Sequence, residues 1–199
     1  TWAGGKFGGG LNFDGVNDRV TIPVTGSYVA KGNLGFASSE SFAISLWYRG
    51  TDTSGGHASV GKGLLVIPDG TVWAGLVMFN GYPEFAHYNA GWNHNIRSAV
   101  NIADNTWHQV TYVNNNDLGW LYVDGVAVVS GASSVIETGK YFQPSAVAAG
   151  YNAQYTSGSF DEVRIYSRAL GANEITRLYN TGVSKLTSAT SDTANGLVG

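Results

Sequence analysis

The stretch Trp120-Leu121-Tyr122-Val123-Asp124-Gly125-Val126-Ala127-Val128-Val129 decides the fold class of this chain. Two runs of β-branched and aromatic residues flank an Asp-Gly pair. Asp-Gly in this setting is the strongest short-range signal for a hairpin, because a type I′ turn needs φ > 0 at both central residues. The sequence therefore predicts a β-hairpin whose tip is Asp124 and Gly125.

Short runs of the same kind recur along the chain between clusters of Gly, Asn and Asp, which is typical of a sandwich or a barrel. We expect strands at 19–23, 41–48, 63–67, 72–79, 84–88, 107–113 and 159–166. Alternation along 41–48 places Phe42, Ile44 and Leu46 on one face. Helical periodicity is convincing only around Glu174–Tyr179, and we expect this helix to end at Asn180 and Gly182. The length and the single helix favour an all-β fold, a two-sheet antiparallel β-sandwich with one short C-terminal helix, over a closed barrel.

Composition limits the partners and the compartment. Charged residues make up 13% of the 199 residues and the net charge is −3, so no basic surface is expected to bind nucleic acid. No apolar run approaches the roughly 20 residues needed to cross a bilayer, so no membrane insertion is expected. With no cysteine, disulfides and thiolate metal sites are excluded. A surface of uncharged polar residues is typical of exported β-proteins, and we expect an extracellular or cell-surface location.

The strand pattern fades near the C-terminus. From Val183 the composition becomes rich in Ser and Thr, as in a linker. We expect one domain at residues 1–182, and a linker or the start of a next module at residues 183–199. The chain begins at Thr1, and we expect it to be a segment of a larger chain with neighbouring domains.

Three segments carry a resemblance to a known family. They are Gly9-Gly10-Leu11-Asn12-Phe13-Asp14-Gly15-Val16-Asn17-Asp18-Arg19-Val20, then Trp107-His108-Gln109-Val110 with Leu121-Tyr122-Val123-Asp124-Gly125, and finally Phe160-Asp161-Glu162-Val163-Arg164-Ile165-Tyr166-Ser167-Arg168-Ala169-Leu170. Their order and spacing over residues 4–182 resemble the laminin-G-like, concanavalin-A-type jelly roll of bacterial surface and secreted proteins. The resemblance implies two curved antiparallel sheets, often with one structural calcium, and it indicates the fold better than the function.

A calcium site is the first candidate for binding chemistry. Ca²⁺ takes six to eight oxygen ligands, and Asp14, the Gly15 carbonyl and Asp18 lie in one tight turn. In similar folds the first and last strands are neighbours, which would bring Asp161 to this turn. We therefore expect Asp14, Gly15, Asp18 and Asp161 to hold a structural Ca²⁺. The alternative is that Asp14 and Asp18 make Asx turns and Asp161 caps a strand end.

An aromatic stretch between Asn80 and Arg97 is the second candidate. Alternation along 84–88 puts Phe85 and His87 on one face and Tyr88 on the other, and we expect Trp92 in a loop next to Gly91. Sugar rings stack on exposed aromatic rings and exchange hydrogen bonds with Asn and Arg side chains. We expect a ligand site formed by Tyr88, Trp92, Asn93, Arg97 and, as an outlying member, Tyr151. The alternative is that most of these rings belong to the core.

Glycoside hydrolysis is the enzymatic alternative. A retaining hydrolase needs two carboxyl groups about 5–5.5 Å apart. The family's hydrolases show a Glu-x-Asp-x-x-Glu or Glu-x-Asp-x-Glu run, and this sequence contains neither. We therefore expect a non-catalytic carbohydrate-binding or adhesion module, stabilised by calcium, that contacts a glycan or a cell-surface partner. A ligand-free structural spacer and a hydrolase-related domain are the alternatives.

Overall fold

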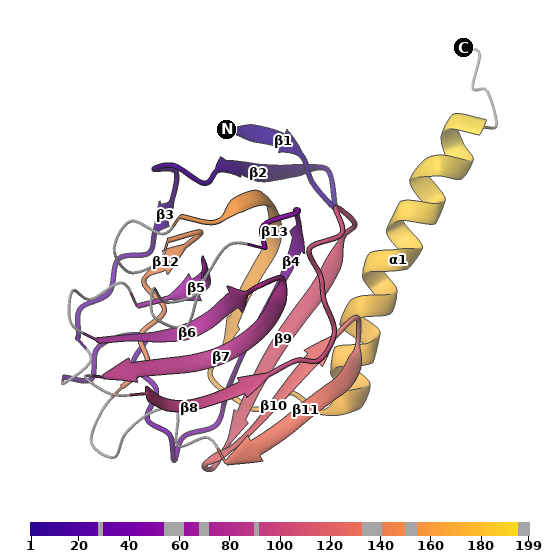
Figure 1. The fold of residues 1–199 in the computed structure, drawn as a ribbon. Coiled ribbons are helices and arrows are strands. Elements are labelled where there is room, and N and C mark those ends of the chain that lie inside the picture. The colour runs from indigo at the N-terminus through magenta and orange to yellow at the C-terminus, as the bar shows by residue number, and fades with distance from the viewer. Residues whose placement is uncertain are drawn as a thin grey trace.

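The computed structural model describes residues 1–27, 30–53, 62–67, 72–89, 92–132, 141–149 and 155–194. Within these ranges the side chains at 72–73, 87–89, 92–95 and 185–194 are not described. Two antiparallel sheets lie face to face and one C-terminal helix packs outside them (Figure 1). The predicted two-sheet β-sandwich is confirmed.

One sheet has seven strands, which include the first two strands of the chain and the last one. Its spatial order is β1 (Trp2–Gly4), β2 (Gly9–Asp14), β13 (Ser157–Tyr166), β4 (Phe42–Arg49), β9 (His108–Asn115), β10 (Leu118–Val123) and β11 (Val126–Ala132). The first strands therefore pair with the last one, because β2 lies directly beside β13.

The other sheet has six strands. Its order is β3 (Val20–Thr21), β12 (Ala146–Val147), β5 (Lys62–Val66), β6 (Val72–Phe79), β7 (Tyr82–Asn89) and β8 (Trp92–Arg97). In Figure 1 this sheet lies in front of the longer strands of the other sheet.

Positive-φ residues form the tight hairpin turns. Asp124 has φ 52° and Gly125 has φ 77° between β10 and β11, so the predicted type I′ turn is confirmed. Asn116 (φ 49°) and Asp117 (φ 65°) make the same kind of turn between β9 and β10. These short loops keep neighbouring strands antiparallel and fix their register.

The core lies between the two inner faces. Phe42, Ile44 and Leu46 alternate inward along β4, as predicted, and none of them is exposed. Phe85 of β7 stacks on Tyr112 of β9 with ring centroids 3.7 Å apart, which joins the two sheets at the centre of the sandwich. Phe85 is fully buried, and its predicted place in the core is confirmed.

The helix α1 (Ala172–Ala194) covers the outer face of the seven-stranded sheet. Ile175 packs against Ala43, Val113 and Tyr122 on that face. Tyr179 stacks on Trp47 with ring centroids 5.6 Å apart. The helix is thus fixed to the sandwich by its first three turns.

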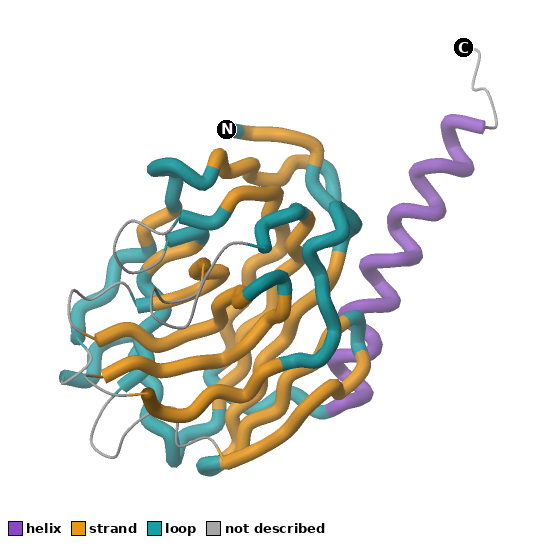
Figure 2. The backbone as a smooth tube through the Cα atoms, in the orientation of Figure 1, coloured by secondary structure: helices purple, strands orange, loops and turns teal. Residues whose placement is uncertain are grey.

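The end of the helix differs from our expectation. We expected it to stop at Asn180 and Gly182, yet it continues to Ala194 and projects away from the sandwich (Figure 2). Gly182 lies against Trp47 and Phe7, where a β-carbon would overlap the Trp47 ring. The glycine therefore permits close packing rather than ending the helix. Within the described residues, no helix combines the length and apolarity needed to cross a bilayer.

Candidate functional site

The turn between β2 and β3 contains three of the predicted calcium ligands. Asp14 Oδ1 accepts hydrogen bonds from the backbone N–H groups of Val16 (2.8 Å) and Asn17 (3.4 Å). Asp18 Oδ2 accepts one from the N–H of Asp14 (3.3 Å). The Val16 N–H holds the pKa of the Asp14 carboxyl below its usual value. This is the Asx-turn arrangement that the sequence left open as an alternative.

Asp161 does not reach this turn. β2 and β13 are neighbours as expected, but Ser157 is the residue that pairs with Asp14. Asp161 lies further along β13, about 13 Å away at roughly 3.3 Å per residue. Its carboxylate accepts hydrogen bonds from the N–H groups of Phe7 and Glu162, both 2.8 Å. The predicted grouping of Asp161 with the turn is therefore wrong.

The residues present do not form a four-residue calcium cage. Among the described residues, no three His, Cys, Asp or Glu side chains converge on a possible metal position. Calcium binding by Asp14, Gly15 and Asp18 stays a prediction, without Asp161.

Four of the predicted ligand residues lie in β7 and β8. Tyr88 pairs with Trp92, and Asn93 pairs with His87. Trp92 begins strand β8, so our expectation of a loop position was wrong. The side chains of Tyr88, Trp92 and Asn93 fall outside the described part of the structure, as does the whole of Tyr151. Their predicted role in binding stays a prediction.

Arg97, the fourth member, is held in an ion pair on the outer face of the six-stranded sheet. Its Nε lies 2.5 Å from Glu84 Oε2, and its guanidinium stacks over the Phe79 ring at 4.1 Å from the centroid. Glu84 is only 4% exposed. A buried carboxylate needs such a partner, which gives Arg97 a structural task on this face.

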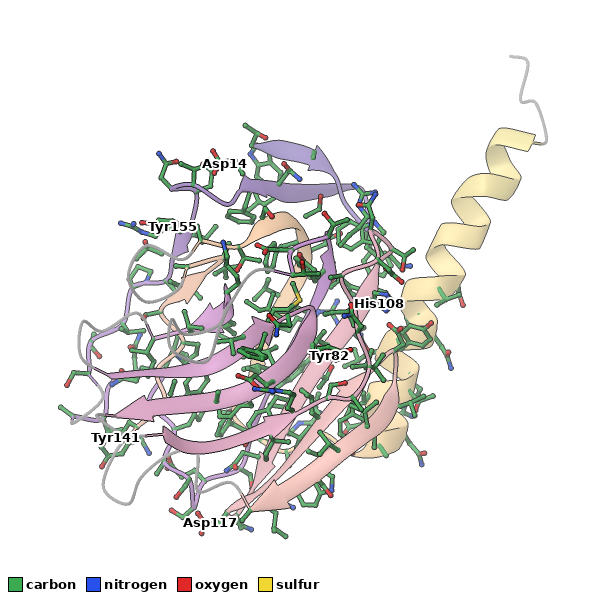
Figure 3. The ribbon with its side chains drawn as sticks, in the orientation of Figure 1. Asp14, Tyr82, His108, Asp117, Tyr141 and Tyr155 are labelled. Atoms are coloured by element: carbon green, nitrogen blue, oxygen red, sulfur yellow. The ribbon has the colours of Figure 1, made fainter. Side chains whose placement is uncertain are left out.

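A groove of about 560 Å³ lies at the opposite edge of the same outer face. Val20 and Val147 form a pair that faces the core, so the next pair, Thr21 and Ala146, faces outward. The groove is lined by Arg19, Thr21, Ile22, Pro23, Val24, Ser145, Ala146, Ala149 and Tyr155. Figure 3 shows Tyr155 beside β3, on the side of the molecule where Asp14 lies.

Arg19 and Tyr155 form the polar centre of this groove. Arg19 Nη1 donates a hydrogen bond to the Tyr155 hydroxyl oxygen, 3.1 Å away. The two residues are 136 positions apart in the chain. Arg19 comes directly after the turn that begins at Asp14 and directly before β3. The hydrogen bonds of Asp14 and Asp18 in this turn therefore fix the point at which β3 begins.

The backbone around Tyr155 is fixed from several sides. Lys62 Nζ donates to the Tyr155 carbonyl oxygen (2.6 Å) and lies 3.6 Å from Asp52 Oδ2. The same Asp52 oxygen accepts the Ser157 N–H at 3.2 Å. Thr156 Oγ1 donates to the Gly63 carbonyl oxygen (2.8 Å). These contacts fix the backbone that carries Tyr155, and the hydrogen bond from Arg19 holds its hydroxyl group.

A second groove, of about 420 Å³, opens where the two sheets part near β1. Its walls are apolar side chains of the sheet edge, including Leu11, Ile22 and Val163. Trp2 lines it with 80% of its surface exposed. The first groove combines ring, hydroxyl and guanidinium groups, whereas this second one is largely apolar.

The contacts of His108 resemble those of a catalytic triad. Its Nδ1 lies 2.7 Å from Asp124 Oδ2, and its Nε2 lies 3.0 Å from Thr106 Oγ1. Asp104 Oδ1 also lies 3.1 Å from Nε2 and accepts the Thr106 hydroxyl proton. Asp124, and more weakly Asp104, raises the pKa of His108. These contacts hold the imidazole between the turn at Asp104 and the β10–β11 turn at Asp124, which gives the cluster a structural task.

Sequence reasoning missed the Arg19–Tyr155 groove. Arg19 stood inside one of the motifs and Tyr155 was one more aromatic residue near the C-terminal strands. No local pattern links positions so far apart. The only available signal was the expectation that the first and last strands are neighbours, which also brings the two flanking segments together.

Comparisons with known proteins agree with this architecture. A family model described as the concanavalin A-like lectin/glucanases superfamily matches residues 14–176. A search of curated proteins finds no match.

Solved structures share the fold. Domain 4 of AbnA, a GH43 extracellular arabinanase from Geobacillus stearothermophilus, in complex with arabinotriose, has a TM-score of 0.68 at 21% identity, over 89% of this chain and 80% of that one. The binding domain of Paraclostridial Mosquitocidal Protein 1 has a TM-score of 0.61 at 16% identity, over 91% of this chain and 45% of that one. The binding domain of Botulinum Neurotoxin DC in complex with SialylT has a TM-score of 0.55 at 18% identity, over 72% and 36%. At such identities the likeness concerns the fold alone.

The strand order, the inter-sheet core and the match over residues 14–176 point to one family. The chain belongs to the concanavalin A-like lectin/glucanases superfamily.

Proposed function

We propose that this chain is a non-catalytic carbohydrate-binding module of an extracellular multidomain protein, used for binding to glycans or for adhesion to glycan-bearing surfaces. The observation that carries the proposal is the groove of about 560 Å³ that contains Arg19 and Tyr155. Its volume falls within the usual range for small-ligand sites, roughly 300–1,000 Å³.

The lining suits a sugar. Small-molecule sites combine an apolar surface with a few placed polar groups. Ile22, Pro23 and Val24 offer apolar surface to the C–H faces of a pyranose or furanose ring, and Thr21 and Ser145 offer hydroxyl groups. The groove lies in the outer face of the six-stranded sheet, whose other edge carries Arg97.

The relatives are consistent with this role. The solved structures with this fold include a domain of an extracellular arabinanase in complex with arabinotriose and a toxin binding domain in complex with SialylT. Those ligands belong to those proteins, and they support here only the general idea of a glycan-binding module.

The described acidic residues support a non-catalytic role, although the superfamily also includes glucanases. Hydrolysis by the usual mechanisms needs two carboxyl groups facing one bond. Glu84 is paired with Arg97, and Asp52 binds Ser157 and Lys62. Asp161 binds two backbone N–H groups. Each of these carboxylates therefore has a task in holding the fold.

A glycan array followed by calorimetry tests the proposal. Thr21 is exposed and points into the groove, so Thr21→Trp should fill the groove and abolish binding of whichever glycan the wild type takes. Val126 on β11 is 63% exposed, and Val126→Trp adds the same bulk on the edge of the other sheet as a matched control.

Two results would contradict the proposal. If the wild type binds no glycan, the module is a spacer or binds another class of partner. If it releases reducing sugar from the same glycans, and one Asp or Glu substitution abolishes that release, the domain is a hydrolase.

A further inference from the structure

Among the described arginines, Arg19, Arg49 and Arg177 have no carboxylate within 4 Å, and of these three only Arg19 lines the groove of about 560 Å³. Arg97 is paired with Glu84, Arg164 with Glu162, and Arg168 with Glu174. In the part of the chain that the structure describes, the only hydrogen-bond partner of Arg19 is the neutral hydroxyl of Tyr155. Arg19 is thus a full positive charge inside a groove without a carboxylate to balance it.

The nearest carboxylate in the sequence is already engaged. Asp18 directs its Oδ2 to the backbone N–H of Asp14 at 3.3 Å. Its oxygens do not come within 4 Å of the Arg19 nitrogens, since the ion pairs found among the described residues do not include this one. This hydrogen bond holds the Asp18 carboxylate in the loop. The Arg19 guanidinium therefore remains available in the groove.

The Arg19–Tyr155 pair also leaves suitable donors. The Tyr155 oxygen accepts a hydrogen bond from Arg19 Nη1, so its own O–H remains able to donate. The guanidinium has five N–H groups in a planar fork and uses one of them here. The pair can thus present a fork of charged donors and a phenol O–H side by side, and a carboxylate is the group that such a fork binds in two-point fashion.

The surroundings select for a sugar that carries this carboxylate. Thr21 and Ser145 supply hydroxyls, and Ile22, Pro23 and Val24 supply apolar surface that is at least partly exposed. A long aliphatic acid would leave those hydroxyls without partners, whereas a sugar ring hydroxyl can satisfy them.

We propose that the groove binds an acidic saccharide, with its carboxylate on Arg19 and Tyr155 and its ring against the apolar wall formed by Ile22, Pro23 and Val24. This inference rests on the proposed carbohydrate-binding function and adds the charge of the ligand. It makes Arg19 the residue that distinguishes acidic from neutral glycans.

A matched pair of ligands tests the charge directly. The probes are tetragalacturonate and the same oligomer after chemical reduction of its carboxylates to primary alcohols, together with a panel of neutral arabino- and gluco-oligosaccharides and a second acidic set of sialylated and alginate oligomers. Titration calorimetry at low and high salt measures each affinity. We expect an acidic oligomer to bind at least tenfold more tightly than its neutral counterpart, because reduction to the alcohol removes the charge-assisted hydrogen bonds to the guanidinium. That preference should shrink at high salt.

Variants then assign the preference to the groove. Arg19→Gln should lower affinity for the acidic oligomer by about tenfold or more, Arg19→Lys should restore part of it as a point charge, and Tyr155→Phe should weaken it less. Arg177→Gln, an equal charge change on the exposed surface of α1, should have no effect. Circular dichroism spectra and melting temperatures confirm that each variant is folded.

The outcomes separate the two proposals. Binding of neutral glycans that is as tight as binding of acidic ones, with no loss in Arg19→Gln, overturns this inference and leaves the proposed function standing. Acidic binding that is lost equally in Arg177→Gln also overturns it, because a diffuse charge effect then explains the preference. Absence of binding to every glycan overturns both.

Discussion

The pH dependence of stability should depend on His108 and its contact with Asp124. His108 Nδ1 lies 2.7 Å from Asp124 Oδ2, and the two side chains are 14% and 29% exposed. Asp124 Oδ1 also accepts the Gln109 N–H at 2.9 Å. Asp124→Asn keeps an oxygen for that N–H and a residue that tolerates φ > 0, but it removes the charge that faces the imidazole.

The direction of the pH dependence follows from the raised pKa of His108. The hydrogen bond to Asp124 raises it above the ordinary value near 6.5. A group whose pKa is raised by folding contributes stability that is fully present below the unfolded pKa. That stability is lost as the pH rises through the folded pKa. We therefore expect the advantage of the wild type over Asp124→Asn to be largest near pH 6 and to shrink toward pH 9.

The size of the stability difference follows from the solvent exposure of the His108–Asp124 pair. A hydrogen bond to a charged group contributes about 1.5–3 kcal/mol. Because the His108–Asp124 pair is partly exposed to solvent, we expect its contribution to be about 1.5 kcal/mol. For a domain of this length that corresponds to roughly 3–6 °C in melting temperature. Lys6 also interacts electrostatically with Asp124, so a small part of the difference should persist at high pH. Asp104 adds little because its side chain is 53% exposed.

Thermal unfolding followed by circular dichroism between pH 5.5 and 9, at constant ionic strength, measures this difference. Asp117→Asn is the matched control, because Asp117 is an exposed aspartate with φ 65° in the neighbouring type I′ turn. Two results would refute the reasoning. One is a pH-independent gap between the wild type and Asp124→Asn, and the other is the same pH-dependent gap with Asp117→Asn.

Two further predictions concern the tail and calcium. Removal of residues 186–199 should leave the melting temperature within about 2 °C of the wild type, because the described contacts of α1 with the sandwich lie between Ile175 and Gly182; a loss of several degrees would contradict the expected domain boundary. Calcium at 100 times its dissociation constant should stabilise the fold by about 2.7 kcal/mol, and Asp14→Asn should remove this gain. Asp161→Asn should instead lower stability equally with and without calcium, and a melting curve of the wild type that EDTA leaves unchanged would exclude the site.

Much of the fold could be predicted because its determinants are local. The turn at Asp124 and Gly125 needs positive φ at both positions, and Asp-Gly is a pair that accepts it. Alternation along β4 placed Phe42, Ile44 and Leu46 on one face, and burial of that face is what the structure shows. A period of two and a tight turn are readable within ten residues.

The errors arose where a distant contact decides the outcome. Gly182 looked like a helix end, but the glycine is required because Trp47, far away in the chain, lies against it. Asp161 looked like a partner of Asp14, and the pairing of β2 with β13 is real, yet register places Ser157 there instead. Neighbouring strands can be inferred from a resemblance, whereas register cannot be inferred without the cross-strand contacts that fix it.

The motif residues that reveal the family are mainly occupied in holding the fold together. Asp124 fixes a turn, binds His108 and receives the Gln109 N–H, while Asp161 fastens the N-terminal segment through Phe7. Of the residues at the centre of the groove, Tyr155, Thr21 and Ser145 lie outside all the motifs. A sequence can therefore keep every family signature and change what the groove binds. For this fold, residues beside the edge strand β3 and its neighbour β12 should differ between modules of different specificity, because there a substitution alters the ligand site without disturbing the core between the sheets.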